Sequence, residues 1–137
     1  MADLVPNLQS LVDSDRFLAA VNMHALDDML DARDADPFDR EWVRVHELVT
    51  QRQIGASSAV DALRESAFKR AFAITRSPDV CGYISDDFGL IADAARAGVS
   101  DAWLAALAAS YVSGVLPHGE LPGDSRSVSE IVSEFRP

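Results

Sequence analysis

The stretch SSAVDALRESAFKRAFAITRSPD, residues 57–79, shows most clearly how this chain folds. Its apolar residues recur every three or four positions, which is the spacing of one face of an α-helix. They are Val60, Leu63, Ala67, Ala71 and Ile74, widened by Phe68 and Phe72. Ser57 or Ser58 can cap the start of this helix, and Ser58 with Asp61 resembles a capping box. The helix ends before Pro78, because the residue preceding a proline avoids helical angles.

Helical spacing continues on both sides of this stretch, and the sequence lacks the alternating apolar and polar residues that are typical of strands. The expected helices cover residues 6–13, 15–33, 37–52, 57–76, 86–97, 101–113 and 127–135. We expect Asp13 or Ser14 to cap the second of these helices and Asp36 to cap the third, with Pro37 at its first position. Ser127 and Glu130 predict a capping box for the last.

The sequence therefore predicts an all-α fold, a single-domain bundle of about five main helices with short terminal helical pieces. The 137 residues suit one domain with one core. Residues 118–137 are rich in proline and glycine at their start. They are expected to form a loosely packed C-terminal tail with a short helix.

The charge of the chain narrows the range of partners. Twenty-two acidic residues against twelve basic ones give a net charge of −10, which repels nucleic acids and anionic membranes. No apolar run approaches the ~20 residues of a membrane helix. The single cysteine and the lack of a secretory signal pattern predict a cytoplasmic protein. Arginine far outnumbers the one lysine, Lys69, which together with many alanines suggests a bacterial gene.

The stretch YISDDFG, residues 83–89, contains the Asp-Phe-Gly triplet of protein kinases. The glycine-rich loop and catalytic loop that kinase chemistry also needs are absent from this sequence. We interpret the stretch as a helix start instead, with Ser85 as its cap and Asp86 and Asp87 in the first turn. Gly89 then remains unexplained, because glycine inside a helix costs ~1 kcal/mol relative to alanine. We expect it to admit another backbone.

Neither a catalytic residue nor a metal site nor a cofactor is predicted. Cys81 has acidic rather than basic neighbours, so we interpret it as a buried apolar side chain. The three histidines, His24, His46 and His118, lack the spacing of metal ligands and are expected at the surface or in hydrogen bonds. The stretch from Asp34 also fails as a calcium loop, because Asp39 stands where glycine is required.

The run DDMLDARDADPFDRE, residues 27–41, is the strongest candidate for a binding site. It holds seven acidic residues and two arginines. Capping explains Asp36 and Asp39, but the other aspartates lie toward the end of the expected helix 15–33, where the helix dipole disfavours anions. Such a departure from local rules suggests a function. The predicted partner-binding residues are Asp27, Asp28, Asp31, Asp34 and Glu41.

We therefore predict a non-enzymatic protein-binding module that holds a basic partner protein, most concretely an immunity or antitoxin-like inhibitor of a toxin. An acidic surface accelerates association with the basic cleft of a toxin that acts on nucleic acid. One alternative is a magnesium-dependent all-α hydrolase, with Asp28 and Asp31 as ligands and Asp61 or Glu65 completing the site. Another is a homo-oligomeric adaptor or regulatory subunit that buries Trp42 or Trp103 at an interface.

Overall fold

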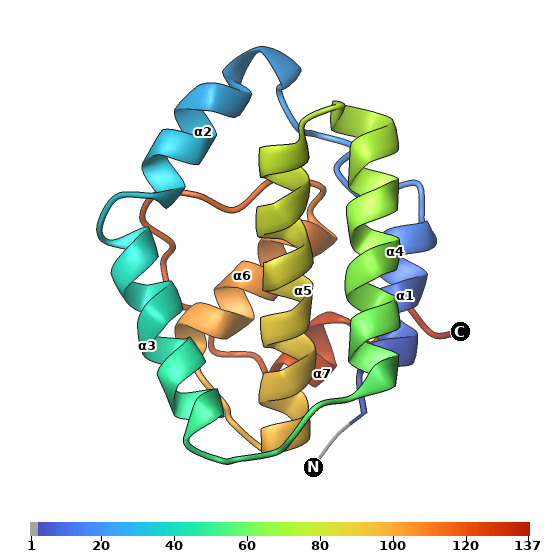
Figure 1. The fold of residues 1–137 in the computed structure, drawn as a ribbon, viewed down its shortest axis with the longest axis vertical. Helices are drawn as coiled ribbons and strands as arrows, with labels where there is room; N and C mark the ends of the chain where they lie inside the picture. Colours follow the sequence, from blue (N-terminus) through green and yellow to red (C-terminus); the bar gives the residue numbers. More distant parts are fainter. Residues whose placement is uncertain (1–2) are drawn as a thin grey trace.

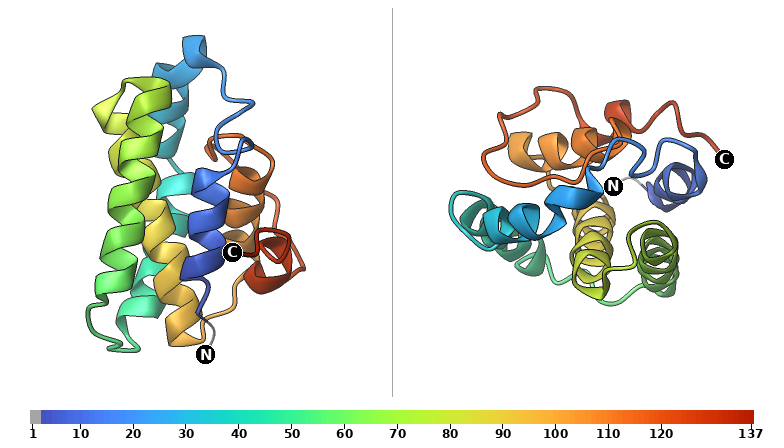
Figure 2. Two further views of the ribbon diagram at one scale, coloured as in Figure 1. Left: turned by 90° about the vertical axis from the view of Figure 1, so that its right-hand side faces the viewer. Right: turned by 90° about the horizontal axis from the view of Figure 1, so that it is seen from above.

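A computed structural model describes residues 3–137, and within this range the chain is all-α, as predicted. The helices are α1 (Val5–Asp13), the 3-10 helix η1 (Met23–Ala25), α2 (Leu26–Arg33), α3 (Phe38–Thr50), α4 (Ser58–Thr75), α5 (Pro78–Ala97), α6 (Ala102–Val112) and α7 (Val128–Ile131). α5 is the central helix, with α4 on one side and α2 and α3 on the other (Figure 1). Behind this layer lie α6, α1 and α7 (Figure 2).

The antiparallel pair of α4 and α5 forms the centre of the bundle (Figure 1). The predicted stripe of α4 is buried at Val60, Leu63, Ala67 and Ala71. Its cap is Ser57, whose hydroxyl accepts a hydrogen bond from Val60 N at 3.3 Å, so the capping box expected from Ser58 and Asp61 is wrong.

The start of α5 differs from the prediction by eight residues. Arg76 ends α4 with left-handed backbone angles, and the hydroxyl of Ser77 accepts a hydrogen bond from Val80 N at 3.3 Å. Pro78 then occupies the first helical position, where its missing N–H costs nothing. The same proline that ends α4 thus begins α5. Ser85 is a mid-helix residue, and its predicted capping role is wrong.

This correction leads to a prediction about helix capping. Ser77→Ala should lower the free energy of unfolding by ~1 kcal/mol, because it leaves a backbone N–H of α5 without its partner. Ser85→Ala is the matched control and should have a smaller effect, because Ser85 lies inside the helix, where alanine has the higher propensity. Urea denaturation of both variants measures the difference. An equal loss in the two variants would contradict the assignment of the cap.

The predicted helix 15–33 is wrong in its first half. Leu18 has a positive φ of 57°, and Ala20 N donates to Gly114 O at 2.9 Å. The segment between α1 and η1 is therefore held by tertiary contacts, with Phe17 and Leu18 buried in the core. The regular helix α2 begins only at Leu26, so Asp27 and Asp28 lie in its first turn, where the dipole favours them.

The cap expected from Asp36 is also wrong. The residue before α3 is Pro37, and no side chain caps this helix. Asp39 and Glu41 do lie in the first turn of α3, as predicted for Asp39.

The C-terminal segment packs against the rear of the bundle (Figure 2). The capping box of Ser127 and Glu130 is confirmed. Ile131, Val132 and Phe135 are buried, so this end of the chain contributes to the core. Across residues 3–137, every helix is too short or too polar to cross a lipid bilayer.

Candidate functional site

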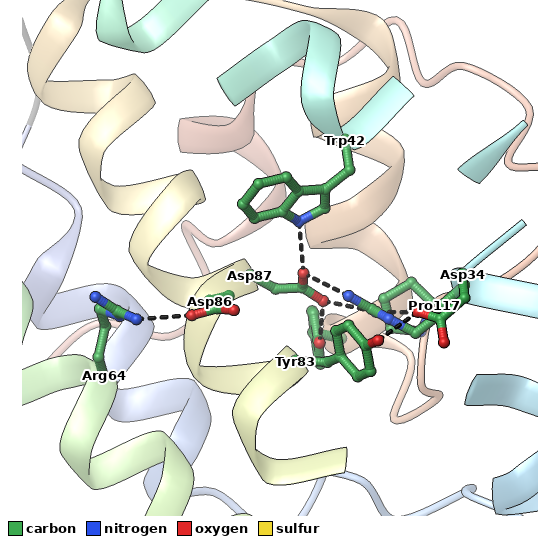
Figure 3. A network of polar contacts seen from close by, with 9 residues as sticks. Asp34, Trp42, Arg64, Tyr83, Asp86, Asp87 and Pro117 are labelled. Atoms are coloured by element: carbon green, nitrogen blue, oxygen red, sulfur yellow. Dashed lines mark hydrogen bonds and ion pairs between the residues drawn. The ribbon is translucent and has the colours of Figure 1, made fainter. Parts of the chain in front are cut away.

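A buried polar network around Asp87 joins the elements that carry the acidic residues. Arg33, in the last turn of α2, donates two hydrogen bonds of 2.8 Å to the Asp87 carboxylate and one of 3.0 Å to the carbonyl oxygen of Pro117. Trp42 Nε1 of α3 donates to the same carboxylate at 2.9 Å, and the hydroxyl of Tyr111 donates at 2.5 Å (Figure 3). One carboxylate of α5 thus links α2, α3, α6 and the loop after α6.

Burial makes this network energetically demanding. The side chains of Arg33 and Asp87 are 2% and 0% exposed, and a buried charge is tolerated only when it is paired and hydrogen-bonded. Burial by itself would lower the pKa of Arg33, but the charge of Asp87 and the hydrogen bonds to it outweigh this and raise the pKa above its ordinary value. Burial and the charge of Asp87 raise the pKa of Tyr111 well above its ordinary value. Both donors are therefore held in their protonated forms.

The neighbouring Asp86 points to the opposite side of α5 and is exposed (Figure 3). It pairs with Arg64 of α4 at 2.7 Å. The side chain of Arg64 crosses α5 at Gly89, where an added Cβ would lie 2.7 Å from Arg64 Cδ. Gly89 therefore admits a side chain, and the expectation that it admits a backbone is wrong.

The predicted partner-binding residues fall into two groups. Asp27, Asp28, Asp31 and Asp34 are all exposed on or next to α2. Within residues 3–137, Asp27, Asp28 and Asp31 have no ion-pair partner, whereas Asp34 accepts a hydrogen bond from the hydroxyl of Tyr83. That hydrogen bond raises the pKa of Tyr83.

Glu41 differs from these four residues in its surroundings. It is half-buried and forms an ion pair of 2.9 Å with Arg44, which also pairs with Asp101 at 2.8 Å. Its carboxylate is therefore already engaged inside the chain.

The fold places two further aspartates near the predicted partner-binding residues, Asp79 and Asp86, and neither was predicted to bind a partner. An open cleft of about 570 Å³ between α2 and α5 is lined by Asp31 and Asp34 on one side and by Asp79 and Asp86 on the other. Tyr83 also lines it, from the same helix as Asp79 and Asp86. The spacing of residues 79, 83 and 86 is that of one helix face, so a helix start placed at Ser77 would have revealed this set.

The remaining residues of interest have structural surroundings. Cys81 is 0% exposed, as predicted, and burial raises the pKa of its thiol. His24 is exposed, His46 stacks on Trp42 with ring centroids 5.2 Å apart, and a ring nitrogen of His118 lies 2.7 Å from Leu116 O. The expectation for the three histidines is thereby confirmed.

The structure also tests features of the two alternative functions, a magnesium-dependent hydrolase and a homo-oligomeric adaptor. In the described part of the chain, no three His, Cys, Asp or Glu side chains are placed to hold a metal ion, so Asp28 and Asp31 do not converge with Asp61 and Glu65. Trp103 is 6% exposed and packs edge-on against Phe38 inside the core, with ring centroids 5.2 Å apart. It does not offer a surface to a second subunit.

Comparison with known proteins identifies the family of this chain. Neither the curated proteins nor the solved structures contain a match. A protein-family model described as "Immunity protein PIM1" matches residues 7–118, a range that includes most of α1, all of η1 to α6, the Asp87 network and the acidic cleft. Because the match covers most of the chain, the protein belongs to the PIM1 family of immunity proteins.

Proposed function

We propose that this protein is a non-enzymatic inhibitor that binds a basic toxin and blocks its activity. Membership of an immunity-protein family is the observation that carries this proposal, because such a protein acts through a partner protein. The net charge of −10 supports a basic partner. The proposed contact surface consists of Asp27, Asp28, Asp31 and Asp34, with Glu41 at its edge.

The exposed side of α2 suits a surface that attracts a basic partner. Asp27, Asp28 and Asp31 project from a single helix and lack counter-charges in residues 3–137. Uncompensated surface charge of one sign raises the association rate constant with an oppositely charged partner by ~10- to 1,000-fold at low salt. Arg33 holds this helix through Asp87, so the charges are presented from a fixed position. Rapid capture is what protection from a toxin requires.

We also propose that the inhibitor acts in the cytoplasm. Its one cysteine is buried and forms no disulfide within the chain, which fits a reducing compartment.

Co-expression tests the proposal directly. If a toxin is encoded next to this gene, that toxin should stop growth of a bacterial host when expressed alone, and growth should recover when this protein is expressed with it. The two proteins should also elute together in size-exclusion chromatography. Continued growth arrest with a stably folded inhibitor, or separate elution, would overturn the proposal.

A further inference from the structure

We infer that the cleft between α2 and α5 is a docking groove for a basic segment of the toxin, whose backbone passes directly over Gly82. This inference rests on the proposed function and adds the place and the manner of contact. The centre of the groove is the exposed side of α5 near Tyr83, and this part of the chain lies outside the acidic run at residues 27–41.

Gly82 is the first observation that points to this groove. It lies in the second turn of α5, where glycine is the poorest helix former apart from proline. An added Cβ at Gly82 would meet nothing within 4 Å, whereas at Gly89 it would meet Arg64 Cδ at 2.7 Å. Packing within this chain therefore accounts for Gly89 but not for Gly82. A partner backbone that approaches α5 closely would account for it.

The walls of the groove are the second observation. Four aspartates line the same cleft as Gly82: Asp31 and Asp34, in and just after α2, and Asp79 and Asp86 of α5. Only Asp86 has an ion-pair partner in residues 3–137, Arg64. Leu30 and Tyr83 add apolar surface to the same cleft. An arginine or lysine side chain fits these walls, because its alkyl part contacts the apolar surface and its charge meets the carboxylates.

Charge also decides between the possible occupants. A second copy of this chain carries the same net charge of −10, and a nucleic acid is also negative. A metal ion would need converging ligands, and residues 3–137 contain no such group. A basic protein segment is the occupant that matches the groove.

A first measurement needs no toxin. Tetra-arginine peptide added to the ¹⁵N-labelled protein should shift the amide signals of residues 79–83 more than those of residues 58–62. These two segments are matched, because each is the first part of a helix and carries one exposed aspartate in its first turn, Asp79 or Asp61. Equal shifts in both segments would overturn the groove.

The decisive variant is Gly82→Ala, because stability and binding should change in opposite directions. The variant should raise the Tm by ~2–4 °C, since alanine favours the helix. It should weaken binding of the toxin identified by co-expression by ~10-fold or more, since its methyl group occupies the space that the partner backbone needs. Calorimetry measures the Kd of each variant. Asp79→Asn and Asp61→Asn form a matched pair, and of these only Asp79→Asn should weaken binding.

The outcomes separate this inference from the proposed function. If wild type binds the toxin and Gly82→Ala binds equally well, the groove is wrong and the proposed function stands. If wild type does not bind the toxin, the proposed function and this occupant both fail.

Discussion

Asp87→Ala is expected to lower the free energy of unfolding by ~3–5 kcal/mol, as for other buried ion pairs that lose one partner. The substitution leaves the guanidinium of Arg33 buried without its counter-ion and removes the acceptor of Trp42 and Tyr111. Because domains of this kind are stable by only ~5–15 kcal/mol, a large part of the total stability is involved. The shift of the urea unfolding midpoint measures this loss.

The adjacent residue provides the control for this experiment. Asp86 is also paired with an arginine, but the side chains of Asp86 and Arg64 are 49% and 43% exposed. Exposed ion pairs contribute only ~0–1 kcal/mol, so Asp86→Ala should leave the midpoint nearly unchanged. If the two variants lose the same stability, the network around Asp87 does not hold the fold together. The comparison also tests whether the adjacent Asp86 and Asp87 have different roles, with Asp87 stabilising the core and Asp86 forming only an exposed ion pair.

Neutralising the acidic surface of α2 should weaken toxin binding by ~100-fold or more, mainly through slower association. The variant replaces Asp27, Asp28, Asp31 and Asp34 with asparagine. Its association rate constant should also lose most of its dependence on salt, because salt screens the charges that attract the partner. Stopped-flow or surface plasmon resonance measurements at several ionic strengths give both quantities.

A second variant separates the effect of this surface from that of total charge. It replaces four exposed acidic residues of α1, α4 and the segment after α1 with their amides: Asp13, Asp15, Asp61 and Glu65. Both variants remove four negative charges, so they have the same net charge. If the second variant weakens binding as much as the first, overall charge attracts the toxin and the α2 surface has no special role. If neither variant changes binding, the proposed contact is wrong.

Local features predicted much of this fold. The helical spacing in α4 correctly predicted that Val60, Leu63, Ala67 and Ala71 are buried, although Phe68 of the same predicted face is exposed. The Ser127–Glu130 box correctly predicted the start of α7. These features succeed because side-chain direction and capping depend on residues within one or two turns. The helix predicted from apolar spacing over residues 15–33 is absent from the segment between α1 and η1. There, apolar residues are buried by tertiary contact in a backbone that is not helical.

The position of each acidic residue relative to a helix dipole depends on where the helix begins and ends. Asp27 and Asp28 no longer contradict the helix dipole, because α2 begins at Leu26. Asp31 and Asp34 remain at the unfavourable end of α2, and they are the two that meet Asp79 and Asp86 across the cleft. Within the run at residues 27–41, the aspartates that the helix dipole disfavours are therefore those that line the cleft with α5.

The all-α fold, the strongly negative net charge and the burial of the single cysteine could all be predicted from the residues alone. Each of these follows from composition or from spacing within a few turns. The burial of Asp87 beside an exposed Asp86, and the acidic cleft between α2 and α5, depend on how the helices pack and could not be predicted in this way. Arg33 and Asp87 are 54 residues apart, and nothing local to either one specifies the other. Their pairing is selected because burying either charge alone would cost more than the folded state can tolerate.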